Sequence, residues 1–163
     1  MDMILLLGVV TGMRSMTAIA ALCWAGWMGL VPEHGWAIWI TYLVSAIIFT
    51  ACALGEYVAD TLPKTPSRTA PGPAIVRLII GGLIGALVAT AIYEPVAGGI
   101  ILGSLGALIG TWGGYWMRMT AARMFGRDLP AAILESLSAL VLAVVAIERL
   151  HHSIAFDLQR QAR

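Results

Sequence analysis

The chain has 163 residues, of which 60% are apolar and only 12% are charged, and its formal net charge at pH 7 is +1. A soluble domain is usually about 45–50% apolar and about 25% charged, and a folded chain this small cannot hide so much apolar surface from water. The near-zero net charge offers no basic surface for nucleic acid. The composition therefore excludes soluble and nucleic-acid-binding proteins and predicts an all-α integral membrane bundle, a single transmembrane domain over residues 1–163.

The first apolar stretch, residues 3–31, is interrupted by a charge within Gly12-Met13-Arg14. Because a charge in the middle of a bilayer is costly, Arg14 is expected near an interface or in a polar interior. We therefore predict a broken or re-entrant first segment, with Gly12 as its hinge and Ser15 or Thr17 as the cap of the next helix. Asp2 stands where a signal peptide carries positive charge, so we expect the segment to be retained.

Four further stretches reach the length of about 20 apolar residues that a membrane span needs. They cover residues 36–57, 74–93, 96–117 and 130–150. Together with the first segment they predict four to five transmembrane helices. Residues 151–163 alternate apolar and polar side chains, and we expect this tail to rest at the membrane interface.

The basic residues of the connections gather in two long loops, residues 59–73 and 118–129. The positive-inside rule places both loops in the cytoplasm, which predicts a multi-pass protein of the bacterial inner membrane. The first loop holds four prolines beside Lys64 and Arg68. Its stiff path and its hydrogen-bond donors suit a phosphate, a lipid headgroup or another anion. A rigid connector whose cations only set the topology explains this loop equally well.

Glycines recur along two neighbouring spans at intervals of three and four residues. They are Gly81 and Gly85 in the span over 74–93, and Gly99, Gly103, Gly106, Gly110 and Gly114 in the span over 96–117. This spacing aligns the glycines on one helix face, where they let helices approach closely in lipid. The glycine zipper predicts either a subunit interface or narrow lumen in a homo-oligomer, or tight packing of the two spans within one chain.

Ionisable side chains inside the spans give the sharpest signal for a site. Glu56 and Asp60 are four residues apart and share a helix face. Charges within a membrane pair or line a wet cavity, and by default they mark a functional site. We therefore predict that an ion or small anion binds at Arg14, Glu56, Asp60 and Glu135, with Lys64 and Arg68 at the mouth. A structural network of arginines and carboxylates is the competing interpretation, and it is favoured for Arg77, whose side chain can snorkel toward the interface.

Three stretches carry a family resemblance. Gly12-Met13-Arg14 is an early Gly-x-Arg, residues 55–63 read Gly-Glu-x-x-Ala-Asp-x-x-Pro, and residues 65–68 read Thr-Pro-Ser-Arg. Together they resemble a family of small bacterial integral membrane proteins classed as a domain of unknown function. Members of that family tend to carry an acidic residue early in the last span, as Glu135 does here. The resemblance implies a membrane fold and supports the same site residues, but it implies no activity.

The sequence contains no catalytic triad, metal-ligand spacing, phosphate-binding loop or cofactor motif. We therefore expect no enzyme activity, no metal and no cofactor. The convergence of charges predicts a small oligomeric transporter or channel in contact with membrane lipids. The alternative is a non-catalytic accessory or scaffold subunit of a larger membrane complex, holding lipid or pigment. A lipid-modifying enzyme using Glu56 and Asp60 as acid and base ranks third.

Overall fold

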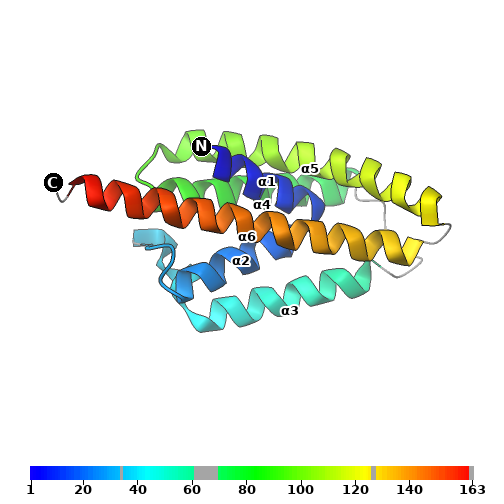
Figure 1. Ribbon diagram of the computed structural model, residues 1–163, viewed down its shortest axis with the longest axis horizontal. Coiled ribbons are helices and arrows are strands. Elements are labelled where there is room, and N and C mark those ends of the chain that lie inside the picture. The colour runs from blue at the N-terminus through cyan, green and yellow to red at the C-terminus, as the bar shows by residue number, and fades with distance from the viewer. Residues whose placement is uncertain (34, 61–69, 126–127, 162–163) are drawn as a thin grey trace.

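A computed structural model describes residues 1–33, 35–60, 70–125 and 128–161, and these segments are helical with short connections and no strand (Figure 1). The elements in chain order are α1 (Asp2–Met13), α2 (Ser15–Trp27), the 3-10 helix η1 (Gly35–Thr41), α3 (Leu43–Ala59), α4 (Pro71–Ala91), α5 (Val96–Phe125) and α6 (Asp128–Gln161). The predicted all-α membrane bundle is thereby confirmed.

Within the described segments, three helices are long and apolar enough to cross a membrane, namely α4, α5 and α6. The pair formed by η1 and α3 gives a fourth span when it is counted as one, although its two parts are bent by 69°. These four correspond to the predicted spans. The helices α5 and α6 extend beyond the predicted boundaries, and residues 151–161 continue α6 without a break rather than forming a separate tail.

The first segment is bent back on itself. The break is a single residue, Arg14, whose extended backbone (φ −144°, ψ 99°) separates α1 from α2. In Figure 1, α1 runs from the N-terminus toward the middle of the bundle, and α2 runs back toward the end from which α1 came. The segment is therefore re-entrant. The prediction of Gly12 as the hinge was wrong, because Gly12 lies inside α1 and faces the backbone of α5.

Glycines of α5 bring three helices into contact within one chain. A Cβ added at Gly103 would lie 3.0 Å from the Cα atom of Gly85 on α4, and one added at Gly106 would lie 2.9 Å from the Cα atom of Gly8 on α1. Such approaches leave no room for a side chain, so helix backbones touch directly, as small residues permit in lipid. Gly99 and Gly103 of this stripe pack on α4, as the packing alternative predicts, whereas Gly106 and Gly110 pack on α1, which was not predicted.

The helix ends sort into two groups. The C-terminal ends of α3 and α5 and the N-terminal ends of α4 and α6 lie together at the right of Figure 1, which we call the α3–α4 end. The N-terminus of α1 and the C-terminal end of α6 lie at the opposite end. The two long loops of the sequence analysis thus border the same end of the bundle.

Helix α3 is the most peripheral of the spans. Its only buried side chains are Ala46 and Ala53, and its remaining apolar side chains are largely exposed on the outside of the bundle. Its contacts with α2 include a hydrogen bond from the Trp24 indole Nε1 to Thr50 Oγ1, of 2.9 Å. Because small residues and a few polar contacts hold α3, it is the least firmly packed of the long helices.

Candidate functional site

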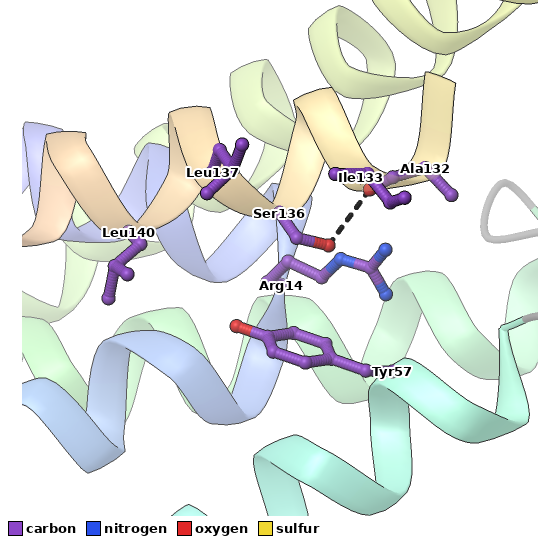
Figure 2. Close-up of a pocket in the computed structure, with 7 residues that line it drawn as sticks. All are labelled: Arg14, Tyr57, Ala132, Ile133, Ser136, Leu137 and Leu140. Carbon is purple, nitrogen blue, oxygen red and sulfur yellow. Dashed lines mark hydrogen bonds between the residues drawn. The ribbon is translucent and has the colours of Figure 1, made fainter. Parts of the chain in front are cut away.

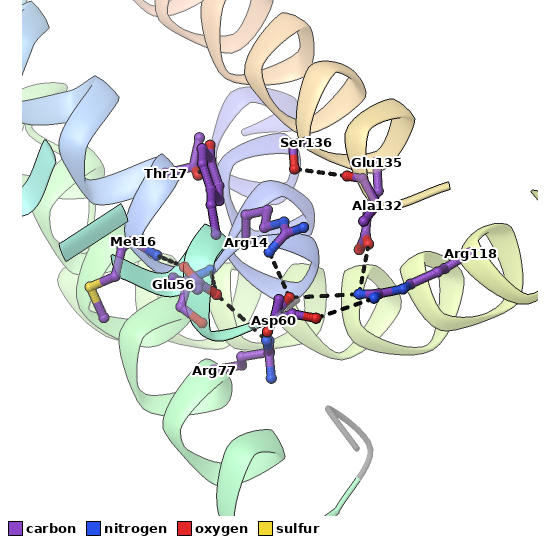
Figure 3. A network of polar contacts seen from close by, with 12 residues as sticks. Arg14, Met16, Thr17, Glu56, Asp60, Arg77, Arg118, Ala132, Glu135 and Ser136 are labelled. Atoms are coloured by element: carbon purple, nitrogen blue, oxygen red, sulfur yellow. Dashed lines mark hydrogen bonds and ion pairs between the residues drawn. The ribbon is translucent and has the colours of Figure 1, made fainter. Parts of the chain in front are cut away.

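Among the described residues, six charged side chains meet near the α3–α4 end and form what we call the charge network (Figure 3). Its members are Arg14, Glu56, Asp60, Arg77, Arg118 and Glu135, and they come from the α1–α2 break and from α3, α4, α5 and α6. Arg77 and Glu135 follow the starts of α4 and α6 by six and seven residues. At 1.5 Å per residue the network therefore lies about 10 Å inward from those helix ends.

Arg14 is the most enclosed cation of the network. Its side chain is 1% exposed, and its Nη1 donates to Asp60 Oδ2 over 2.6 Å. The guanidinium also lies over the ring of Tyr57, 5.0 Å from the ring centroid, a distance at which a cation is attracted to an aromatic face. The re-entrant break thus carries a positive charge into the bundle, and α3 supplies both the carboxylate and the ring that receive it.

Glu56 caps the start of α2 from a different helix. Its Oε1 and Oε2 accept hydrogen bonds from the backbone N–H groups of Ser15 (3.0 Å) and Met16 (2.9 Å). These two N–H groups belong to the first turn of α2, where no helical carbonyl can accept them. Arg77 Nη2 approaches the same carboxylate at 3.5 Å. The carboxylate therefore occupies a helix N-terminus, a position that attracts anions.

This cap corrects the prediction made for the start of α2. The sequence predicts that Ser15 or Thr17 caps this helix, whereas its N-cap residue in the structure is Arg14. In the structure no side-chain hydrogen bond from the N-cap residue is present, and the Thr17 hydroxyl instead makes a 2.7 Å hydrogen bond with the hydroxyl of Tyr57. The sequence identifies the break between the two helices, but the residue that accepts the hydrogen bond from the Ser15 N–H group is 41 positions away.

Arg118 joins the two remaining carboxylates. Its Nη1 lies 3.8 Å from Asp60 Oδ2 and 3.9 Å from Glu135 Oε2, and its Nη2 donates to the backbone oxygen of Asp60 over 3.4 Å. The Glu135 side chain is fully buried. Through Arg118 the network extends from α3 across α5 to α6.

The formal charges of the network cancel, since three arginines face three carboxylates. A charge buried away from water is tolerated only when a partner compensates it. Each of the four ion pairs joins different elements. The network therefore fixes how the re-entrant segment, α3 and the bundle fit together, and a change in the charge of any member disturbs several contacts.

A cavity of about 290 Å³ adjoins the network between α3 and α6 (Figure 2). Its wall consists of Arg14, Tyr57, Ala132, Ile133, Ser136, Leu137 and Leu140. Figure 2 shows the guanidinium of Arg14 between the ring of Tyr57 and the first turns of α6. The cavity wall is thus apolar except for one cation and two hydroxyl groups.

The structure brings together four of the six predicted binding residues, Arg14, Glu56, Asp60 and Glu135. The other two, Lys64 and Arg68, lie outside the residues that the structure describes. In the described part of the chain no group of three or more His, Cys, Asp or Glu side chains is arranged to hold a metal ion. Glu56 and Asp60 each face a different arginine, Arg77 and Arg14.

Sequence reasoning missed two contributors. For Arg77 it favoured a structural network of arginines and carboxylates, and the buried side chain does reach Glu56 rather than the interface. Arg118 was assigned to a loop, whereas α5 continues past it to Phe125 and holds it inside the network. Tyr57 had no recognised role, although its position beside Glu56 on α3 was a usable signal.

A buried carboxyl also exists away from the network. Glu33, in the connection between α2 and η1, is 9% exposed, and neither of its carboxylate oxygens has a hydrogen-bond partner among the described residues. Burial raises the pKa of this carboxyl from 4.5 to about 8. Because the folded state holds the proton more tightly than the unfolded state, stability is greatest below about pH 4.5 and falls as the pH rises toward 8.

Glu33→Gln is expected to abolish this pH dependence. Between pH 5 and pH 8 the wild type should lose about 2–4 kcal/mol of stability that the variant retains, since one pKa unit corresponds to about 1.4 kcal/mol. The measurement is the thermal unfolding midpoint in detergent micelles at both pH values. Glu94→Gln, at an exposed position between α4 and α5, is the control and should follow the wild type. Parallel pH profiles for the wild type and Glu33→Gln would contradict the prediction.

Comparisons of the chain with protein-family models, with curated proteins and with solved structures give no match. The family resemblance of residues 55–63 therefore stays a prediction.

Proposed function

We propose that the protein is a small membrane transporter of anions, whose substrate site is the charge network together with the adjoining cavity. The observation that carries this proposal is the re-entrant break at Arg14, which places a buried cation and a helix N-terminus beside three carboxylates and a cavity. Transporters commonly bind substrate where helices are interrupted within the membrane, with helix N-termini directed at anionic groups. Ionisable groups inside membranes are costly and mark transport pathways.

In this proposal Arg14 is the anchor for the substrate anion, and the carboxylates of Glu56 and Glu135 are the proton- or ion-coupling groups. The described state is closed to an anion. Asp60 already binds the guanidinium of Arg14, and Glu56 already binds the N-terminus of α2. An arriving anion competes with these carboxylates, and protonation of a carboxylate favours the anion. The mobile part is α3, which carries two of the three carboxylates and is held mainly by small residues.

The orientation of the protein is part of the proposal. The α3–α4 end carries Arg77, Arg118 and Arg123, and the positive-inside rule assigns it to the cytoplasm. We infer a multi-pass protein of the bacterial inner membrane, with Lys64 and Arg68 at the cytoplasmic mouth. A homo-oligomer stays a prediction. Since α1 and α4 cover the glycine stripe, the subunit interface of such an oligomer would use the exposed apolar faces of α3 or α5.

A second candidate function is an accessory or scaffold subunit of a larger membrane complex. The specific observation in its favour is that the charges of the network cancel among themselves, as in a purely structural network. This candidate predicts that the protein copurifies with larger subunits when it is extracted gently from its own membrane. Native mass spectrometry distinguishes the two, since the transporter is expected alone or with copies of itself.

The transporter is tested in proteoliposomes on a solid-supported membrane, with concentration jumps of chloride, nitrate, phosphate and dodecanoate. The wild type is expected to give a current with at least one of these anions. Arg14→Gln should reduce that current about tenfold or more, which corresponds to losing roughly 1.4 kcal/mol of interaction with the anion. Glu56→Gln should reduce the current as well, because a glutamine cannot take up and release the coupling proton.

The matched controls are Arg149→Gln and Glu148→Gln, two exposed positions on α6 near the opposite end. Both should keep the wild-type current. If folded Arg14→Gln and Glu56→Gln proteins carried the same current as the wild type, the assignment of the site would be overturned.

A further inference from the structure

The cavity beside Arg14 has two chemically different parts. Toward the interior lie the guanidinium of Arg14 and the hydroxyl of Tyr57. Toward the outside lie Ile133, Leu137 and Leu140 of α6, each of which is about half exposed. The apolar part therefore reaches the surface of the bundle, while the polar part is enclosed.

The mouth of the cavity opens sideways, between two helices. Its lining residues on α6 belong to the apolar window of that span, which contains residues 130–156. In a membrane such a surface faces hydrocarbon rather than water. A small hydrated anion does not reach the cavity by this route without losing its water, whereas a molecule with an apolar chain enters it directly from the bilayer.

The guanidinium of Arg14, which lines the inner part of the cavity, carries one hydrogen-bond donor without a partner among the described residues. The Nε atom of Arg14 is buried and has no hydrogen-bond partner among the described residues, although Nη1 of the same side chain is bound to Asp60. A buried N–H without an acceptor is unfavourable, and a charged oxygen is its strongest partner. Since Arg14 is the only charged residue among the described residues of the cavity wall, the cavity favours an anionic head over a cationic one.

We propose that the substrate of this site is an anionic amphiphile, a single-chain membrane lipid with a phosphate or carboxylate head, which enters laterally between α3 and α6. The head reaches Arg14 Nε, and the chain lies along Ile133, Leu137 and Leu140. The volume of about 290 Å³ is at the lower limit of ordinary ligand pockets, so it holds the head and the first methylene groups, and the rest of the chain stays in the bilayer. This inference rests on the proposed function and names its substrate class.

The test is binding, not transport, and uses the full chain in phosphatidylcholine nanodiscs. Native mass spectrometry counts bound dodecyl phosphate, dodecanoate, dodecanol, dodecyltrimethylammonium and inorganic phosphate at equal concentrations. The two anionic amphiphiles are expected to bind about tenfold more tightly than the other three probes, as one charge-assisted hydrogen bond to the head provides. Equal binding of dodecanol would show a groove without head recognition, and equal binding of inorganic phosphate would show a small-anion site; either result would overturn the inference.

Two tryptophan variants decide where the probe binds. Leu137→Trp fills the cavity and should weaken binding of dodecyl phosphate about tenfold, because overfilling a pocket forces its walls apart. Leu134→Trp is the matched control, since Leu134 lies on the same helix with 47% exposure against 54% for Leu137 but does not line the cavity. It should bind as the wild type does. Arg14→Gln should lose the preference for anionic heads, and if this variant does not fold, the tryptophan pair alone decides.

Failure of the inference and failure of the transporter proposal look different. If Leu137→Trp leaves amphiphile binding unchanged while small anions still give currents that need Arg14, the substrate class is wrong and the transporter stands. If the amphiphiles bind as expected but no anion gives a current, the binding site stands and the transporter is wrong.

Discussion

Replacing Glu56 with alanine is expected to lower the free energy of unfolding by about 3–5 kcal/mol, the usual cost of removing one member of a buried charged pair. The loss has two sources. The N–H groups of Ser15 and Met16 lose the carboxylate that accepts both of them, and Arg77 loses the carboxylate 3.5 Å from its Nη2. Because these groups lie inside the bundle, water does not replace the lost contacts fully.

A graded series separates the two sources. Glu56→Gln keeps an oxygen for one N–H group but loses the charge that faces Arg77, so its loss should be about half that of Glu56→Ala. Glu148→Ala, at an exposed position on α6, should unfold as the wild type does. The measurement is the thermal or denaturant unfolding of the three variants in detergent micelles. A Glu56→Ala protein as stable as the Glu148→Ala control would mean that the network does not hold the re-entrant segment in place.

The second large effect is expected at Gly103, where α1, α4 and α5 meet. A Cβ added there would lie 3.0 Å from the Cα atom of Gly85 and still closer to the carbonyl oxygen of Gly81. Neither neighbour can move aside as a flexible side chain does, because both contacts are with backbone. Gly103→Ala should therefore destabilise the protein by about 2–4 kcal/mol, at or above the usual range for overpacking.

A control substitution on the same helix is expected to change the stability in the opposite direction. Gly113 has nothing within 4 Å of an added Cβ, so Gly113→Ala should stabilise α5 by up to about 1 kcal/mol through its higher helix propensity. Both variants are compared by thermal unfolding and by their elution as a single species. If Gly103→Ala were as stable as Gly113→Ala, the close packing of α5 against α4 would be wrong.

Hydropathy was sufficient to predict most of the fold. A span needs a long apolar run whatever its partners are, so the sequence alone locates η1–α3, α4, α5 and α6. The ends of α5 and α6 were less predictable. Both helices continue into polar residues that no longer sit in an apolar run, and what extends them is hydrogen bonding along the helix rather than hydropathy.

The sequence could predict site residues only where their spacing along a single helix places them on one face. Glu56 and Asp60 share a face of α3, which spacing reveals directly. That Arg118 lies between Asp60 and Glu135 depends on how α3, α5 and α6 pack, and no local pattern encodes that packing. The hinge was misplaced for a similar reason. Gly12 has the flexibility of a hinge, but its missing side chain serves the contact with α5, and Arg14 adopts the extended conformation instead.

The contact between α1 and α5 also sets an order of events during synthesis. Gly8 of α1 packs on Gly106, which the ribosome adds only after about a hundred further residues, or roughly 5–20 seconds later at ordinary elongation rates. Until then α1, about 18 Å long at 1.5 Å per residue, is too short to cross the bilayer and lacks the helix on which its glycines pack. Helix α1 is therefore made well before this partner, and its final packing waits for α5 and for α6, which also contacts α1.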